Sequence, residues 1–126
     1  MKTKFSSSWI KSKQPRKQRK YRHNAPLHIK QKFVSVHLSK ELRKKYSKRS
    51  MNLRKGDSVK VARGQFKNKT GKVGEVSVKK TSVYINGIEI VKKDGTKARY
   101  PINPSNLIIT EMSMDDKMRG KIIGRK

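Results

Sequence analysis

The chain has 126 residues, of which 35 are Lys or Arg and 8 are Asp or Glu, so its formal charge is +27 at pH 7. Hydrophobic residues make up 32% and aromatic residues 6%, which is too few for a packed core that uses the whole chain. These figures favour one small folded unit with basic extensions. A charge of this size repels itself, so the partner is expected to be a polyanion, either nucleic acid or an anionic membrane surface.

Several classes of protein are excluded by what the sequence lacks. No apolar run approaches the roughly 20 residues that cross a bilayer, and residues 1–22 lack the apolar segment of an export signal. The absence of cysteine removes disulfides, thiolate zinc sites and cysteine nucleophiles together. We therefore expect a cytoplasmic protein without a membrane span.

The charge is unevenly distributed along the chain. Residues 1–56 hold 19 Lys and Arg against one acid, Glu41, and residues 57–126 hold 16 against seven. The asymmetry marks a boundary near Gly56, with a basic arm before it and a more balanced domain after it. We predict a basic N-terminal arm over residues 1–52, a domain over 53–111, and a C-terminal extension over 112–126.

The arm begins with a stretch that contains no acid and little apolar pattern. Its run 15–24 cannot bury enough surface to fold alone. A short helix is predicted near 26–36, because Pro26 suits a first helical turn and Ile29, Phe33 and Val36 recur at helical spacing.

A second short helix is predicted near 39–47. Ser39 can cap it, and Glu41 suits its positive N-terminal end. Leu38, Leu42 and Tyr46 line one side of this segment, and the opposite side is basic.

From Asp57 onward the hydrophobic period changes from about 3.6 to 2, which is typical of strands. Strands are predicted over 59–61, 71–79, 83–85, 88–90, 98–102 and 107–109. The inward pattern of the second one shifts near Gly74, which indicates a bulge, and Asp94-Gly95 is a hairpin turn signal. The pattern predicts a mainly β fold, a five-stranded barrel of about 55 residues.

Three further positions carry structural expectations. Gly64 and Gly71 are expected to adopt positive φ. Phe66 either stacks on a base or covers the barrel end, and the second role is favoured. Asp115-Asp116 is expected to begin a helical stretch in the C-terminal extension.

Catalysis finds little support. The acids make no convincing pair by spacing, and the three histidines lie in the arm, where Glu41 is the only acid. A metal site would need further carboxylates or thiols there. We predict that the protein is not an enzyme and uses no metal or cofactor.

The arm instead has the composition of an RNA-binding segment. Residues 1–40 carry twelve Lys and Arg without one acid, and Phe5, Trp9, Tyr21 and His23 are interleaved with them. Aromatic side chains beside cations suit unpaired or looped RNA. Trp9 is equally compatible with filling a hydrophobic pocket on a partner.

The candidate RNA-binding residues combine these cations and aromatics with those of the loop 63–69 and its neighbours. They are Arg16, Lys17, Arg19, Lys20, Tyr21, Arg22, His23, Asn24, His28, Lys40, Arg43, Lys44, Arg49, Ser50, Arg54, Lys55, Arg63, Gly64, Lys67, Lys69 and Lys72.

Residues 54–67 (Arg-Lys-Gly-Asp-Ser-Val-Lys-Val-Ala-Arg-Gly-Gln-Phe-Lys), continuing to Thr-Gly-Lys-Val at 70–73, resemble the KOW motif. Segments 24–26, 38–46, 49–51, 94–96 and 104–106 resemble one family that contains this motif. That family is the universal large-subunit ribosomal protein L-twenty-four, in its archaeal and eukaryotic form, also called L-twenty-six-e.

The resemblance implies an SH3-like barrel that binds the 5′ domain of large-subunit ribosomal RNA near the exit of the polypeptide tunnel. It implies a structural role with a part in subunit assembly, which bacterial relatives initiate. Neighbouring ribosomal proteins are implied as partners, nascent chains or targeting factors are candidates, and a homo-oligomer is not expected. Asn68 departs from the glycine of many relatives, but asparagine tolerates a left-handed conformation.

Two other classes remain open. A KOW transcription-elongation module would bind polymerase, although it normally has a second domain. A chromatin-like protein would bind any duplex DNA with comparable affinity. A membrane-active cationic peptide is the weakest alternative, because the apolar sides of the predicted helices are narrow.

Overall fold

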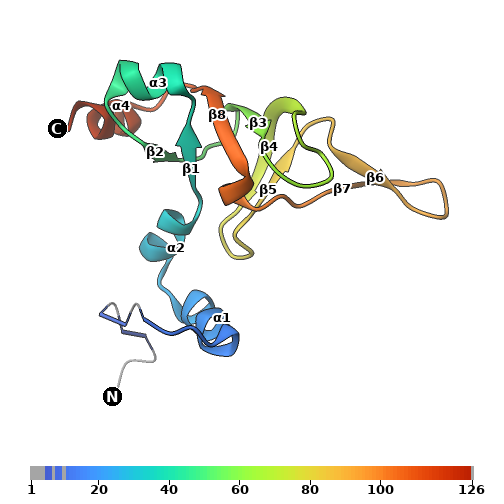
Figure 1. The fold of residues 1–126 in the computed structure, drawn as a ribbon, viewed down its shortest axis with the longest axis horizontal. Coiled ribbons are helices and arrows are strands. Elements are labelled where there is room, and N and C mark those ends of the chain that lie inside the picture. Colours follow the sequence, from blue (N-terminus) through green and yellow to red (C-terminus); the bar gives the residue numbers. More distant parts are fainter. Residues whose placement is uncertain (1–4, 7, 10, 126) are drawn as a thin grey trace.

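The computed structural model describes residues 5–6, 8–9 and 11–125, which form eight strands and four α-helices (Figure 1). Six strands make one sheet in the order β2-β1-β8-β3-β4-β5. They are β1 (Ser35–Leu38), β2 (Ser50–Asn52), β3 (Ser58–Val61), β4 (Thr70–Ser77), β5 (Ser82–Ile85) and β8 (Leu107–Glu111). The mainly β, small barrel-like fold class is thereby confirmed.

Strand β1 lies where the helical spacing predicted the end of a helix. Helix α2 (Leu27–Phe33) stops before it, so the predicted extension of this helix to residue 36 is wrong. Val36 and Leu38 are buried and His37 is exposed, a period-2 pattern that the helical reading of Val36 overlooked. β1 pairs with β2 in antiparallel and with β8 in parallel register, so strand pairing crosses the predicted boundary between residues 52 and 53.

The basic run expected to have no fold of its own is helix α1 (Pro15–Asn24). Pro15 occupies its first turn, where its fixed φ is favourable, and the following Arg, Lys and Gln residues are good helix formers. No residue of α1 is buried, and its sequence contains no aliphatic residue, so it lacks the apolar periodicity by which helices are found. Helix α3 (Lys40–Tyr46) follows β1, and the Leu42 amide donates to the Ser39 hydroxyl at 3.3 Å.

Two glycine predictions have different outcomes. Gly64 has φ +94°, as expected. Gly71 does not have positive φ, so that expectation is wrong; instead a Cβ at Gly71 would lie 2.7 Å from Ile85 Cγ2 and 2.8 Å from the Asn86 carbonyl oxygen. Gly71 is therefore needed for the close approach of β4 to the chain after β5.

The predicted bulge near Gly74 is confirmed, because the pairing of β4 with β5 shifts register between Val73 and Glu75. The predicted number of five strands is wrong, because the main sheet has six. β6 (Glu89–Val91) and β7 (Lys97–Arg99) make a separate hairpin that projects from the sheet (Figure 1). The chain rejoins the sheet at the single bridge between Ile102 and Val83.

The core lies within the main sheet and the segments that cover it. Val59, Val83 and Ile109 are completely buried there. Phe66 is 7% exposed, and its ring centroid lies 5.1 Å from that of Tyr100. Phe66 thus covers the end of the core and is not free to stack on a base.

Candidate nucleic-acid interface

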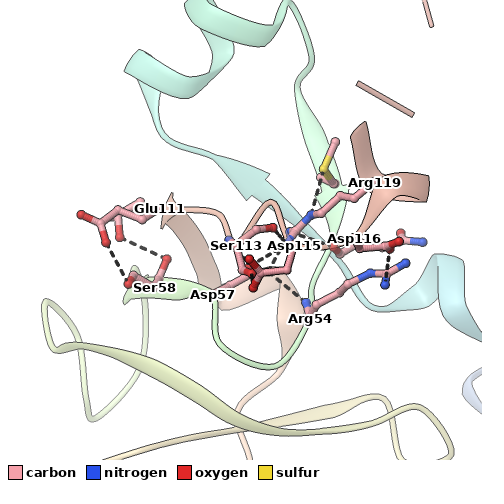
Figure 2. Close-up of polar contacts among 11 residues, drawn as sticks. Arg54, Asp57, Ser58, Glu111, Ser113, Asp115, Asp116 and Arg119 are labelled. Carbon is pink, nitrogen blue, oxygen red and sulfur yellow. Dashed lines mark hydrogen bonds and ion pairs between the residues drawn. The ribbon is translucent and has the colours of Figure 1, made fainter. Parts of the chain in front are cut away.

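The C-terminal helix α4 (Lys117–Gly124) is joined to the sheet by a buried ion pair (Figure 2). Arg119 Nη1 and Nη2 donate to the two carboxylate oxygens of Asp57 at 2.6 and 2.7 Å. Both side chains are at most 2% exposed. This bidentate geometry is the strong form of an Arg–carboxylate contact.

Every polar atom of this pair has a partner. The Asp57 carboxylate also accepts from the backbone amides of Arg54 and Ser113, at 2.9 and 3.1 Å. The remaining Arg119 donors reach the carbonyl oxygens of Ser113 and Asn52 and the sulfur of Met51. The guanidinium uses all five N–H groups, so the cost of burying two charges is offset as far as hydrogen bonding allows.

One of the predicted RNA-binding cations, Arg54, is also bound at the start of α4. The Arg54 guanidinium forms an ion pair with Asp116, whose other carboxylate oxygen accepts from the Met118 amide at 2.9 Å (Figure 2). Asp116 therefore caps α4, as expected of the Asp115-Asp116 pair, and holds Arg54 beside the helix.

Helix α1 presents cations on two faces. Lys17, Lys20, Tyr21 and Asn24 follow helical spacing and line one surface pocket together with residues of the preceding segment. Arg16, Arg19 and Arg22 recur every third residue on another side and are exposed. His23 is exposed, and its Nδ1 lies 3.2 Å from Asn24 Oδ1.

The loop between β3 and β4 presents Arg63, Lys67 and Lys69 to solvent. Two residues of the loop stabilise its conformation. Phe66 is buried in the core, and Asn68 adopts φ +69°, the left-handed conformation that asparagine tolerates. Lys69 Nζ lies 5.1 Å from the centroid of the Phe66 ring. Lys72 is exposed on the adjoining strand β4.

The cations around α3 differ in their availability. Lys40 and Lys44 are exposed, whereas Arg43 is partly buried and its Nε donates to the Leu38 carbonyl oxygen at 2.8 Å. Arg43 thus has a structural contact that its sequence pattern did not indicate. The other predicted residues of this part of the chain are exposed: His28, Arg49, Ser50 and Lys55.

The predicted residues do not form a single patch. Helix α1 lies at one end of the molecule, and the β3–β4 loop and α3 lie far from it (Figure 1). Within the described ranges, ion pairs form at Arg54, Arg99 and Arg119. Of the predicted RNA-binding cations in those ranges, only Arg54 has a carboxylate partner, so the others can accept phosphate neighbours.

Two features were missed by sequence reasoning. Asp57 and Arg119 are 62 positions apart, and no periodicity links them. The grouping of Phe5, Trp9 and Phe33 around Tyr21 was also missed, although the alternation of these aromatics with cations was the available signal.

The Asp94 carboxylate has a lowered pKa. The side chain and the backbone amide of Thr96 both donate to Asp94 Oδ1, at 2.7 and 3.0 Å, and these bonds lower the pKa of Asp94 below 3.8. The contact closes the tip of the β6–β7 hairpin, where Gly95 has φ +83°.

None of the helices in the described part of the chain has the length and apolarity needed to traverse a membrane.

Residues 12–126 match the family model that describes the eukaryotic ribosomal proteins L-twenty-six and the archaeal ribosomal proteins L-twenty-four-P. The chain is 47% identical over 115 residues to the "Large ribosomal subunit protein uL24" of Methanosphaera stadtmanae, covering 91% of this chain and 98% of that protein. It is 49% identical over 114 residues to the protein of the same name from Methanothrix thermoacetophila, covering 90% of this chain and 98% of that protein.

Proposed function

Because this chain belongs to the ribosomal protein family that comprises L-twenty-six of eukaryotes and its archaeal counterpart L-twenty-four-P, we propose that it is a structural constituent of the large ribosomal subunit in the cytoplasm. Its relatives that cover nearly the whole chain are named as large-subunit proteins. In this role the chain has no catalytic task.

The specific role we propose is the binding and scaffolding of ribosomal RNA in the 5′ domain, near the exit of the polypeptide tunnel. The observation that carries it is the set of exposed cations on α1, the β3–β4 loop and β4, which lack carboxylate partners within the described residues. Cations spread over several separate elements suit an RNA surface that surrounds the protein, because each can neutralise a different phosphate.

This scaffolding would also support subunit assembly. Bringing RNA helices together is opposed by phosphate repulsion, and a chain of net charge +27 lowers that repulsion wherever it lies between them. Neighbouring ribosomal proteins would complete its surroundings, and nascent chains or targeting factors could reach it at the tunnel exit. The chain acts as a single copy and not as a homo-oligomer.

Two measurements test the proposal. In a sucrose gradient of native lysate, the chain should sediment with large subunits and remain there after a moderate-salt wash. The purified full chain should bind a 5′-domain RNA fragment more tightly than a DNA duplex of equal length at matched salt. Sedimentation with polymerase or bulk DNA, together with equal affinity for both nucleic acids, would contradict it.

A further inference from the structure

The N-terminal segment (residues 5–33) contains an aromatic cluster outside the sheet. The Tyr21 ring centroid lies 5.0 Å from that of Phe5, 5.2 Å from that of Trp9 and 6.0 Å from that of Phe33. These are four of the eight aromatic residues of the chain. All four are only partly buried, and none belongs to the hydrophobic core. The cluster therefore keeps aromatic surface in contact with solvent.

A pocket of about 520 Å³ opens on this cluster. Phe5, Trp9 and Tyr21 form its aromatic wall, and Lys17, Lys20 and Asn24 lie on the same face of α1 as Tyr21. This volume falls within the range of about 300–1,000 Å³ that small-ligand sites occupy. No carboxylate is among the described residues that line the pocket.

The chemistry of the lining selects among ligands. Flat aromatic rings bind other flat rings by stacking, and two ammonium groups beside them favour a ligand that is also anionic. The Asn24 amide offers both a donor and an acceptor group, the complement of a base edge. A nucleotide combines these three properties, whereas an apolar side chain of a protein partner would leave both lysines and the amide without a role.

We propose that this pocket holds one unpaired base of an RNA, stacked on the aromatic wall, with Lys17 and Lys20 on its flanking phosphates. The inference rests on the proposed function in one respect, namely that RNA is the partner. It adds a defined site and a recognition mode that depends on a base and not on charge alone.

Trp9 is the only tryptophan of the chain, so its fluorescence reports on this pocket. The probes are an eight-nucleotide oligoadenylate and an oligomer with the same number of phosphates whose riboses carry no bases. With the unaltered full chain, the oligoadenylate should bind about tenfold more tightly and quench Trp9, because one base stacks on the aromatic wall and the abasic oligomer has none to stack. Equal affinity for the two probes, or binding without quenching, would overturn the proposal.

A substitution at Tyr21 tests whether the preference for the base-containing probe arises in this pocket. Tyr21→Leu should remove the preference for the base-containing probe, and Tyr46→Leu, the same change on α3 and outside the pocket, should retain it. The comparison of probes on the unaltered chain decides the matter even if Tyr21→Leu loosens α1. Failure of this inference alone would leave binding of the 5′-domain fragment intact, whereas failure of the proposed function would abolish its preference over duplex DNA.

Discussion

The N-terminal segment and the sheet region (residues 34–111) stabilise their residues by different means. Of the described residues in the N-terminal segment only Ala25 is buried, whereas all fifteen members of the core cluster lie in the sheet region. The sheet region also contains the carboxylate that pairs with Arg119 of α4, while residues 1–24 contain no acid. Together with α4 the sheet region is therefore complete in itself, and the N-terminal segment has surfaces that a partner must complete.

The largest loss of stability in the sheet region is expected from removing the buried ion pair. Asp57→Ala should lower the free energy of unfolding by about 3–5 kcal/mol, because it leaves the Arg119 charge buried without a partner. Urea unfolding measures the loss. The double variant with Arg119→Ala should lose less than the sum of the two single variants, and the exposed Arg125→Ala should change stability by no more than about 0.5 kcal/mol. Additive losses would show that the two side chains do not stabilise the fold as a pair.

A smaller loss is expected from Gly71→Ala, about 1–3 kcal/mol, because the added methyl group would collide with Ile85 and with the backbone of Asn86. Gly120→Ala is the matched control. Gly120 lies in α4 with open space around it, so alanine should stabilise the chain by up to about 1 kcal/mol. Thermal unfolding of both variants distinguishes close packing from a general intolerance of alanine, and equal effects would contradict the packing argument.

The N-terminal segment should respond in affinity and not in stability. Replacing Arg16, Arg19 and Arg22 by glutamine should reduce the slope of log affinity for RNA against log salt by about 2–3. Glutamine preserves helix propensity, so the free energy of unfolding should stay within about 0.5 kcal/mol.

The control for this triple variant removes the same charge elsewhere. Lys79, Lys92 and Lys93 are exposed, and we interpret them as a solvated face. Their replacement by glutamine should change the slope by less. If both triple variants lower it equally, charge would act through the whole molecule and not through α1.

The smallest effect concerns the tip of the β6–β7 hairpin. The hydrogen bonds from Thr96 lower the pKa of Asp94, so they stabilise the hairpin above pH 3.8 and this contribution is lost as the pH falls through the lowered value. Thr96→Val removes the hydroxyl donor and should move the Asp94 carboxyl titration, followed by NMR, upward toward 3.8. An unchanged midpoint would show that the backbone amide alone causes the shift.

The sequence predicted the parts of the fold that have local signals. Ser39 and Asp116 act as caps because they lie only three and two residues before the amides that they bind. The bulge near Gly74 followed from a parity shift within a single strand. Helix α1 could not be found in this way, because its ten residues include one aromatic residue, Tyr21, and no aliphatic residue that could set up an apolar period.

The features that sequence reasoning missed depend on distant residues. Val36 fits a helical period as well as a strand period, and its pairing with Met51 of β2 decides between them. Gly71 is restricted by the chain after β5 and not by its own φ. For the candidate interface, the sequence identified the cations but not which of them bind groups of the protein itself. The ion pair of Arg54 and the backbone contact of Arg43 were therefore found only in the structure.

The parallel pairing of β1 with β8 and the Asp57–Arg119 contact both join early parts of the chain to parts that are synthesised much later. Asp57 leaves the site of peptide-bond formation 62 residues before its partner is added, an interval of about 3–12 seconds at typical elongation rates. During that interval the N-terminal segment has already been made, whereas β8, which lies between β1 and β3 in the sheet, is added only near its end. A chain interrupted before Arg119 would keep the cations of α1 but would leave the Asp57 carboxylate without its guanidinium partner.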